Sequence, residues 1–304
     1  MIKITTEQIV SLKITSQEMI EWVNETIKNK KSMLLPEKIS IKMDEGKIFY
    51  NVMPCVVETE GVAGVKVVTR YPNRTPVLDS KLSLYDLKTG YLKAIIDADF
   101  ITTWRTAAVA IHSINLLAVH EFKIISFVGL GTIGKATLKM FLDTIDKKRK
   151  VEIRILNYKN IGESIVKQYE GDTNVTWKLF DNYIDMAKDS DIIVSAVTFA
   201  EEDFADESVY KKGVLLVPIH TRGFQNCDKT FDKIFGDDYN HIQGFKYFAH
   251  FKNFHEISDV INGICVGREN NEERIIAYNI GIALHDIVFA QKIMEKLYNI
   301  KEIK

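Results

Sequence analysis

The chain has 304 residues, of which 46% are hydrophobic and 27% are charged, and its formal net charge is −1 at pH 7. This length is typical of about two domains, and the composition is that of a soluble globular protein. The balanced charge argues against nucleic acid or an anionic membrane as a partner, and no apolar run approaches the roughly 20 residues that span a bilayer. Three cysteines without metal-like spacing, and no recognisable leader, predict reduced thiols, a cytoplasmic location and no metal site.

The first part of the chain predicts an α+β region. Thr15 and Glu18 form a capping-box pattern ahead of apolar residues at helical spacing, so a helix is expected there. Strand-like segments bounded by turn residues follow at positions 39–43, 47–52, 64–69 and 81–86. Residues 100–119 contain alanines but neither glycine nor proline, and they predict a long helix.

From residue 123 the pattern changes to strands that alternate with helical segments. The expected strands are 124–128, 151–156, 191–197 and 213–219, with a helix-like segment at 181–188. This alternation predicts a parallel sheet with right-handed crossovers. A last apolar run, 272–297, has helical spacing and predicts one long helix.

The predicted fold class is therefore α/β. A Rossmann-type, doubly wound parallel sheet domain is expected at 118–276. It is inserted into an α+β domain for substrate binding and dimerisation, formed by 1–117 with 277–304.

The most informative motif is the glycine run that begins with Gly129. An apolar strand enters Gly129-x-Gly131-x-x-Gly134, and a helix-compatible run leaves it, which is the fingerprint of a dinucleotide-binding loop. The glycines allow the tight turn, the close approach of the pyrophosphate and the packing of helix on strand. The phosphates would lie at the helix N-terminus beside Thr132 and Ile133. The alternative is a purely structural glycine turn.

The end of the second Rossmann strand bears on the choice between NAD and NADP. An acidic residue is expected there for NAD, but the sequence has Asn157 and Lys159 instead. Asn157 can hydrogen-bond a ribose and Lys159 can pair with a 2′-phosphate, which favours NADP slightly. The alternative is that Lys159 is a surface lysine and the cofactor is NAD. At the end of the next strand, Ser195, Ala196 and Val197 are expected to contact the cofactor.

Several segments together resemble the ornithine cyclodeaminase/μ-crystallin family, from about residue 30 to the end of the chain. The resemblance implies a homodimer, a Rossmann domain and NAD(P)-dependent chemistry at the carbon–nitrogen bond of amino acids or cyclic imines. The segments are Gly64-Val65-Lys66, Tyr71-Pro72-Asn73, Leu84-Tyr85-Asp86 with Thr89-Gly90, Ile96-Asp97, and Thr102-Thr103-Trp104-Arg105-Thr106-Ala107-Ala108.

By this resemblance, Lys66 and Arg105 match the two cations that hold the substrate carboxylate. Lys38 falls where a third cation, usually arginine, stands. Arginine binds a carboxylate with two hydrogen bonds, whereas lysine offers a point charge. For Lys38 a solvated surface charge is an equally good interpretation. Arg105 lies in an apolar helix, where an unpaired charge is costly, and this favours function.

The sequence departs from the cyclodeaminase pattern after the fourth Rossmann strand. The family's glycine and acid/base aspartate are replaced by His220 and Arg222, which makes ornithine cyclisation doubtful. The site pattern is closest to the diaminopropionate-forming dehydrogenases of siderophore-precursor synthesis, which carry Asp-Asp-x-x-His; here the match is Asp237, Asp238 and His241. Histidine suits proton transfer near neutral pH, so His220 and His241 are catalytic candidates, and Arg222 could bind a second carboxylate. A surface histidine is the alternative for His241.

In the final helical run, Asn279 and Gly281 match the family segment beside substrate and nicotinamide, with Asp286 behind them. A packing role for Gly281 and Asp286 is an equally good interpretation. The leading functional hypothesis is an NAD(P)-dependent amino-acid dehydrogenase or imine reductase, with Lys66 among its catalytic residues. The alternatives are a redox-neutral cyclodeaminase and a non-catalytic NAD(P)H-binding protein.

Overall fold

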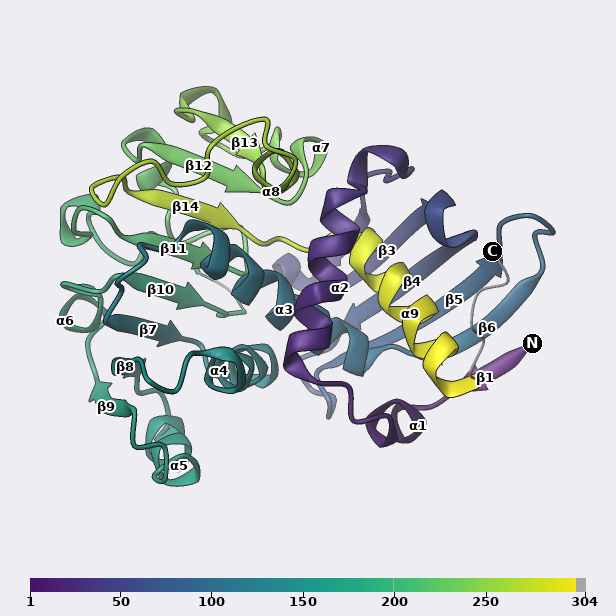
Figure 1. The fold of residues 1–304 in the computed structure, drawn as a ribbon, viewed down its shortest axis with the longest axis horizontal. Coiled ribbons are helices and arrows are strands. Elements are labelled where there is room, and N and C mark those ends of the chain that lie inside the picture. Colours follow the sequence, from purple (N-terminus) through teal and green to yellow (C-terminus); the bar gives the residue numbers. More distant parts are fainter. Residues whose placement is uncertain (199, 299–304) are drawn as a thin grey trace. The chain divides into compact units, whose positions relative to one another are not determined.

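The computed structural model describes residues 1–198 and 200–298, which form two compact units (Figure 1). The first unit comprises 1–105 and 282–304, of which 299–304 lie outside the described residues. The second comprises 106–281. The first boundary falls inside the helix α3 (Asp99–Leu117), upstream of the boundary that the sequence predicts.

The first unit contains a six-stranded sheet in the order β1-β6-β5-β4-β3-β2, in which all neighbours are antiparallel except β1 and β6. Its elements are β1 (Ile2–Ile4), α1 (Thr6–Ser11), α2 (Ser16–Lys28), β2 (Ile39–Met43), β3 (Ile48–Val57), β4 (Val62–Arg70), β5 (Leu78–Asp86), β6 (Leu92–Asp97) and α9 (Ala283–Tyr298). The capping box predicted for α2 is present, because Thr15 accepts from the Glu18 N–H and Glu18 accepts from the Thr15 N–H.

One face of this sheet is covered by α9, which lies across β3, β4 and β5 (Figure 1). Trp22 of α2 packs edge-on against Phe289 on the other side of α9. Gly64 of β4 allows the close approach, since a Cβ there would lie 2.5 Å from the Ile287 side chain. These contacts place α9 close against the sheet.

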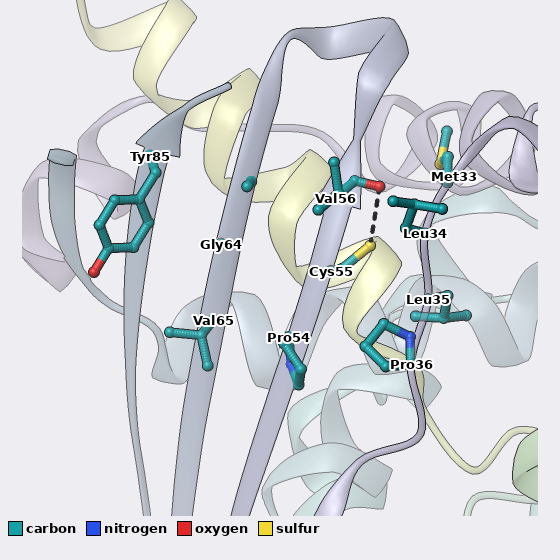
Figure 2. A pocket seen from close by; sticks show the side chains of 11 residues that line it. Met33, Leu34, Leu35, Pro36, Pro54, Cys55, Val56, Gly64, Val65 and Tyr85 are labelled. Carbon is teal, nitrogen blue, oxygen red and sulfur yellow. Dashed lines mark hydrogen bonds between the residues drawn. The ribbon is translucent and has the colours of Figure 1, made fainter. Parts of the chain in front are cut away.

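The opposite face of the sheet exposes apolar side chains that alternate with the buried ones. We call this the apolar sheet face; its half-buried members are Val52, Pro54, Val56, Ala63, Val65, Val67, Tyr85 and Ile95. A pocket of about 690 Å³ lies between this region and the segment from Met33 to Pro36. Figure 2 shows the side chains that line it. Leu34 in that segment is 59% exposed, and Ile39 and Ile41 on the edge strand β2 are also exposed.

The second unit contains an eight-stranded, wholly parallel sheet in the order β13-β12-β14-β11-β10-β7-β8-β9. Its chain order reverses between β7 and β10, which is the switch point where doubly wound sheets bind ligands. The strands are β7 (Ile124–Val128), β8 (Val151–Leu156), β9 (Val175–Phe180), β10 (Ile192–Ser195), β11 (Leu215–Pro218), β12 (Lys233–Gly236), β13 (Phe254–Glu256) and β14 (Ile275–Tyr278). The helices are α4 (Thr132–Thr144), α5 (Ile161–Gln168), α6 (Tyr183–Ala187), α7 (Tyr239–Ile242) and α8 (Ile257–Ile261).

The predicted fold class is confirmed, and β2, β7 and β8 coincide with the expected strands. The prediction of one long helix at 272–297 was wrong, because Ile275–Tyr278 forms β14 and the helix begins only at Ala283. Pairing with β11 and β12 places this apolar segment in the sheet, where both faces are buried. Within the described residues, no helix has the length and apolarity needed to cross a membrane, and no group of three His, Cys, Asp or Glu side chains could hold a metal ion.

Candidate carboxylate and dinucleotide sites

Three charged side chains meet in the first unit, in the layer between the sheet and α9. Lys66 comes from β4, Arg105 from α3 and Asp286 from the first turn of α9. Lys66 Nζ lies 2.6 Å and Arg105 Nε lies 2.8 Å from the same atom, Asp286 Oδ1. Lys66 and Asp286 are fully buried and Arg105 is nearly so. We call these three residues the charged triad.

While Lys66 is protonated, the triad carries one net positive charge in a buried place, because a single carboxylate faces two cations. Among the described residues, no partner satisfies hydrogen-bond geometry toward Lys66 Nζ or Asp286 Oδ2. Burial lowers the pKa of Lys66 to about 7; the charge of Asp286 opposes this shift and that of Arg105 adds to it. Burial alone would raise the pKa of Asp286, but the charges of Arg105 and Lys66 outweigh it and lower that pKa. A further carboxylate would neutralise the cluster.

Lys38 lies in the segment just before β2 and is half-buried. Its positive charge also contributes to lowering the pKa of Lys66, so it acts within electrostatic range of the triad. The proposal that Lys38 is a third carboxylate-binding cation remains a prediction.

In the second unit, the turn after β7 is packed directly against the turn after β10. Gly129 has φ +79°, and a Cβ at this position would lie 2.7 Å from the backbone nitrogen of Val197. The Ala196 N–H donates to the Val128 carbonyl oxygen at 2.8 Å. Ala196 and Val197 thus contact the glycine loop through their backbone, at the switch point of the sheet.

The other two glycines differ in what surrounds them. Gly131 is the N-cap of α4, and a Cβ there would meet nothing within 4 Å. At Gly134 an added Cβ would collide with the carbonyl oxygen of Gly129. Thr132 and Ile133, the first two residues of α4, carry N–H groups that have no acceptor within the helix. Open space beside Gly131 and a tight contact at Gly134 are what a pyrophosphate-binding loop requires.

Ser195 and His220 lie at the ends of the neighbouring strands β10 and β11. Ser195 Oγ is 2.6 Å from His220 Nε2, and the histidine ring stacks on Phe224 and meets Phe204 edge-on. Burial lowers the pKa of His220 to about 4, so its imidazole is neutral at pH 7. A group that transfers protons near neutral pH needs a pKa of about 7, and the pKa of His220 is lower than that.

Arg222 and His241 have different surroundings. Arg222 is exposed. His241 is in α7, and its Nδ1 lies 2.8 Å from Asp238 Oδ1; Asp238 is also the N-cap of that helix. The neighbouring Asp237 accepts a hydrogen bond from the Gly281 N–H at 2.7 Å. The Asp-Asp-x-x-His segment therefore joins the end of β12 to α7 and to the segment after β14.

Asn279 directly follows β14 and is buried. Its Oδ1 accepts from the Ser113 hydroxyl at 2.8 Å, and its Nδ2 donates to the Ala277 carbonyl at 2.9 Å. Gly281 has φ +83°, a backbone conformation that favours glycine over other residues. Both residues have structural roles in the second unit beside any contact with substrate.

At the end of β8, Asn157 is half-buried and both ends of its amide are engaged within the protein. Lys159 is exposed, has φ +53° and places its ammonium 5.1 Å from the centre of the Tyr158 ring. The sequence did not indicate Glu163 as part of this region. It lies in the first turn of α5 and accepts from Asn157 Nδ2 at 2.9 Å.

A model of the ornithine cyclodeaminase/mu-crystallin family matches residues 2–301. The chain belongs to this family. Membership confirms the resemblance seen in the sequence.

Known proteins of several activities are similar to it. The nodulation efficiency protein NfeD of Rhizobium meliloti is 27% identical over 271 residues, which cover 86% of this chain and 83% of the relative. An N-((2S)-2-amino-2-carboxyethyl)-L-glutamate dehydrogenase of Staphylococcus aureus is 21% identical over 227 residues, covering 70% of this chain and 66% of the relative. The solved Δ(1)-pyrroline-2-carboxylate reductase of Thermococcus litoralis, in complex with NADH and L-proline, superposes with a TM-score of 0.82 at 23% identity and covers 98% of both chains. This last likeness shows the shared fold.

Proposed function

We propose that this protein is an NAD(P)-dependent oxidoreductase that acts on the carbon–nitrogen bond of an amino acid, an N-substituted amino acid or an imine that bears a carboxylate. The observation that carries the proposal is the excess positive charge of the buried triad, in a chain whose other unit contains a dinucleotide-type glycine loop. The names of the dehydrogenase and the reductase among the relatives are consistent with it.

The residues of the second unit fit a nicotinamide dinucleotide. The open side of Gly131 leaves room for the pyrophosphate, and the N–H groups of Thr132, Ile133 and Gly134 are free to donate within the geometry of the helix. When bound, the nicotinamide supplies the hydride acceptor or donor at the substrate carbon. Ser195, Ala196 and Val197 at the switch point, and Asn157 at the ribose end, complete the proposed cofactor site.

The triad supplies the carboxylate site. Arg105 and Lys66 hold the α-carboxylate, Lys38 adds positive charge, and Asp286 keeps both cations in place. A bound carboxylate removes the excess charge, so binding relieves an electrostatic cost that the free protein carries. Orientation by two fixed cations limits which face of the α-carbon is presented.

Roles for the remaining candidates follow from their surroundings. His220, neutral at pH 7, orients the Ser195 hydroxyl and can donate or accept a hydrogen bond without changing charge. Arg222 is exposed and can receive a second carboxylate, as an N-substituted amino acid such as the substrate named for the Staphylococcus relative would provide. His241, fixed by Asp238, is the proposed proton-transfer group, and Asn279 and Gly281 are proposed to contact the substrate.

The test is a turnover assay with purified protein. NADH or NADPH is mixed with a panel of 2-oxo acids plus amines and of cyclic imino acids, and absorbance at the nicotinamide band is followed. Oxidation of the cofactor with at least one carboxylate-bearing imine is expected. Absence of cofactor binding by fluorescence would refute the proposal. Product formation without net change in the nicotinamide would indicate a redox-neutral cyclodeaminase, and binding without any turnover would indicate a non-catalytic NAD(P)H-binding protein.

Two glycine variants separate the cofactor site from the fold. Gly131→Ala should leave the melting temperature almost unchanged, because its Cβ meets open space at a negative φ, yet it should weaken NADH binding at least about tenfold by occupying the phosphate space. Gly134→Ala should lower both stability and affinity, because its Cβ collides with Gly129. Thermal unfolding and fluorescence titration measure the two effects. Equal NADH affinity in wild type and Gly131→Ala would contradict this placement of the pyrophosphate.

The titration of Lys66 predicts a pH dependence for substrate capture. Its pKa in the free protein is lowered to about 7, so the ammonium loses its charge as pH rises through that value. The value of kcat/KM for a carboxylate substrate should fall on the alkaline side, whereas kcat should fall only at higher pH because a bound carboxylate raises the pKa again. In Lys66→Arg the alkaline fall should disappear, since arginine stays charged. A pH profile unchanged by this substitution would assign the titration to another group.

We also propose a homodimer that forms through the apolar sheet face and the pocket beside Leu34. An uncovered sheet face with contiguous apolar side chains, next to the exposed edge strand β2, is typical of an association surface. Sedimentation velocity should give about twice the 34.8 kDa mass of the chain, and a monomer at micromolar concentration would rule this surface out.

A further inference from the structure

The end of β8 carries an anionic feature that the sequence of the strand does not reveal. Asn157 stands where a Rossmann sheet commonly has the acid that binds the adenine ribose, and it is an uncharged amide. Glu163 reaches it from the first turn of α5, where its Oε1 accepts from Asn157 Nδ2 at 2.9 Å. The missing carboxylate is thus supplied from the helix rather than from the strand.

The geometry around Asn157 fixes this arrangement. Its Oδ1 accepts from the Gly162 N–H at 3.1 Å, so the amide is clamped at both ends, to Gly162 and to Glu163. Gly162 permits the approach, since a Cβ there would lie 2.9 Å from Asn157 Oδ1. The side-chain nitrogen of Asn157 is therefore already donating to a carboxylate.

Lys159 does not balance that carboxylate through any contact in the described part of the chain. Its ammonium lies over the Tyr158 ring, 5.1 Å from the centroid, on a fully exposed turn. A lysine in such a place is a hydrated charge whose effect is strongly screened by salt. Glu163 is also exposed, but the hydrogen bond from Asn157 holds its carboxylate beside the strand end.

We propose that the Asn157–Glu163 pair makes this protein select NAD(H) over NADP(H). The carboxylate of Glu163 can accept from the ribose hydroxyls, and it repels the additional phosphate of NADP(H). This inference rests on the proposed dinucleotide site, and it reverses the slight preference for NADP that Asn157 and Lys159 indicate in the sequence.

The test is direct binding of NADH and of NADPH, followed by nicotinamide fluorescence at low salt. Wild type should bind NADH at least about tenfold more tightly than NADPH, because a phosphate near a fixed carboxylate experiences about a fivefold penalty per pair of unit charges even in water. Glu163→Gln should tighten NADPH about fivefold or more and change NADH less than about twofold. Glu163 is exposed, so the variant is expected to fold.

Two further variants serve as controls. Glu170→Gln removes an equal charge just beyond the other end of α5, and it should change neither affinity. Lys159→Ala should leave NADPH affinity within about twofold of wild type.

Three results would overturn the inference while leaving the proposed function standing. They are wild-type preference for NADPH or equal affinity for both, the same response in Glu163→Gln and Glu170→Gln, or a large loss of NADPH affinity in Lys159→Ala. If wild type binds neither NADH nor NADPH, the proposed function itself fails, and the inference fails with it.

Discussion

Replacing Asp286 by asparagine should lower the free energy of unfolding by about 3–5 kcal/mol, the range for removing one partner of a buried ion pair. Asp286 is the one carboxylate that faces both Lys66 and Arg105 in the triad, and all three are buried. Its loss leaves two cations together without a counter-charge. Chemical denaturation of wild type and variant at pH 6 measures the difference.

The same variant has a pH signature that a mere packing defect lacks. At pH 9 the Lys66 side chain is largely neutral in the folded wild type, because its pKa is lowered to about 7. The destabilisation should therefore be smaller at pH 9 than at pH 6, although Arg105 still lacks its partner. Asp143→Asn breaks an exposed pair with Lys139 and should cost less than about 1 kcal/mol at either pH. A pH-independent loss in Asp286→Asn would show that the triad charges do not govern stability.

Replacing Arg105 by alanine should reduce kcat/KM by roughly 30-fold to several thousand-fold, as expected for about 2–5 kcal/mol lost with a buried charge contact to substrate. Lys66 and Asp286 then neutralise each other, and no excess positive charge remains for the carboxylate. NADH affinity should stay within about twofold of wild type, because the proposed cofactor residues lie in the other unit. Steady-state kinetics and fluorescence titration separate the two effects.

Arg74→Ala removes an arginine from the same unit that is partly exposed and outside the triad, and it should leave kcat/KM unchanged. Arg105→Lys should recover only part of the activity, since lysine cannot form the paired hydrogen bonds of a guanidinium. If Arg105→Ala weakened NADH binding as much as turnover, Arg105 would not be a substrate-binding residue.

Local patterns were sufficient to predict the strand and helix around the glycine loop. β7 is a short apolar run, and the surroundings of each glycine after it explain why glycine stands there. Sequence and structure therefore agree in this segment. β14 shows where local pattern fails. Ile276 and Ile280 are spaced, together with the residues after them, as on one face of a helix. Ile276 instead lies in a buried strand that has neighbouring strands on both sides, and Gly281 follows at positive φ. The conformation of this segment is decided by its pairing with strands that are distant in the sequence. The local pattern of a single sequence does not reveal that pairing.

The sequence indicated candidate site residues by type, but not how their side chains pair. Arg105 and Lys66 could be named from their segments, but the hydrogen bond from Arg105 to Asp286 joins residues 181 positions apart. Glu163 could not be identified because its role depends on the turn that brings α5 back to Asn157. His241 is held by the carboxylate three residues earlier, a local bond that the helix cap at Asp238 makes possible.

The unneutralised charge of the triad also means that the thermal stability of the free protein should report the binding of acidic ligands. Any small acid that fits beside Lys66 and Arg105 removes a buried electrostatic cost, so it should raise the melting temperature in proportion to its fit and concentration. A library of amino, imino and oxo acids can then be ranked by thermal shift alone, before any redox partner is added. The best-ranked acids define the set from which the substrate is to be sought.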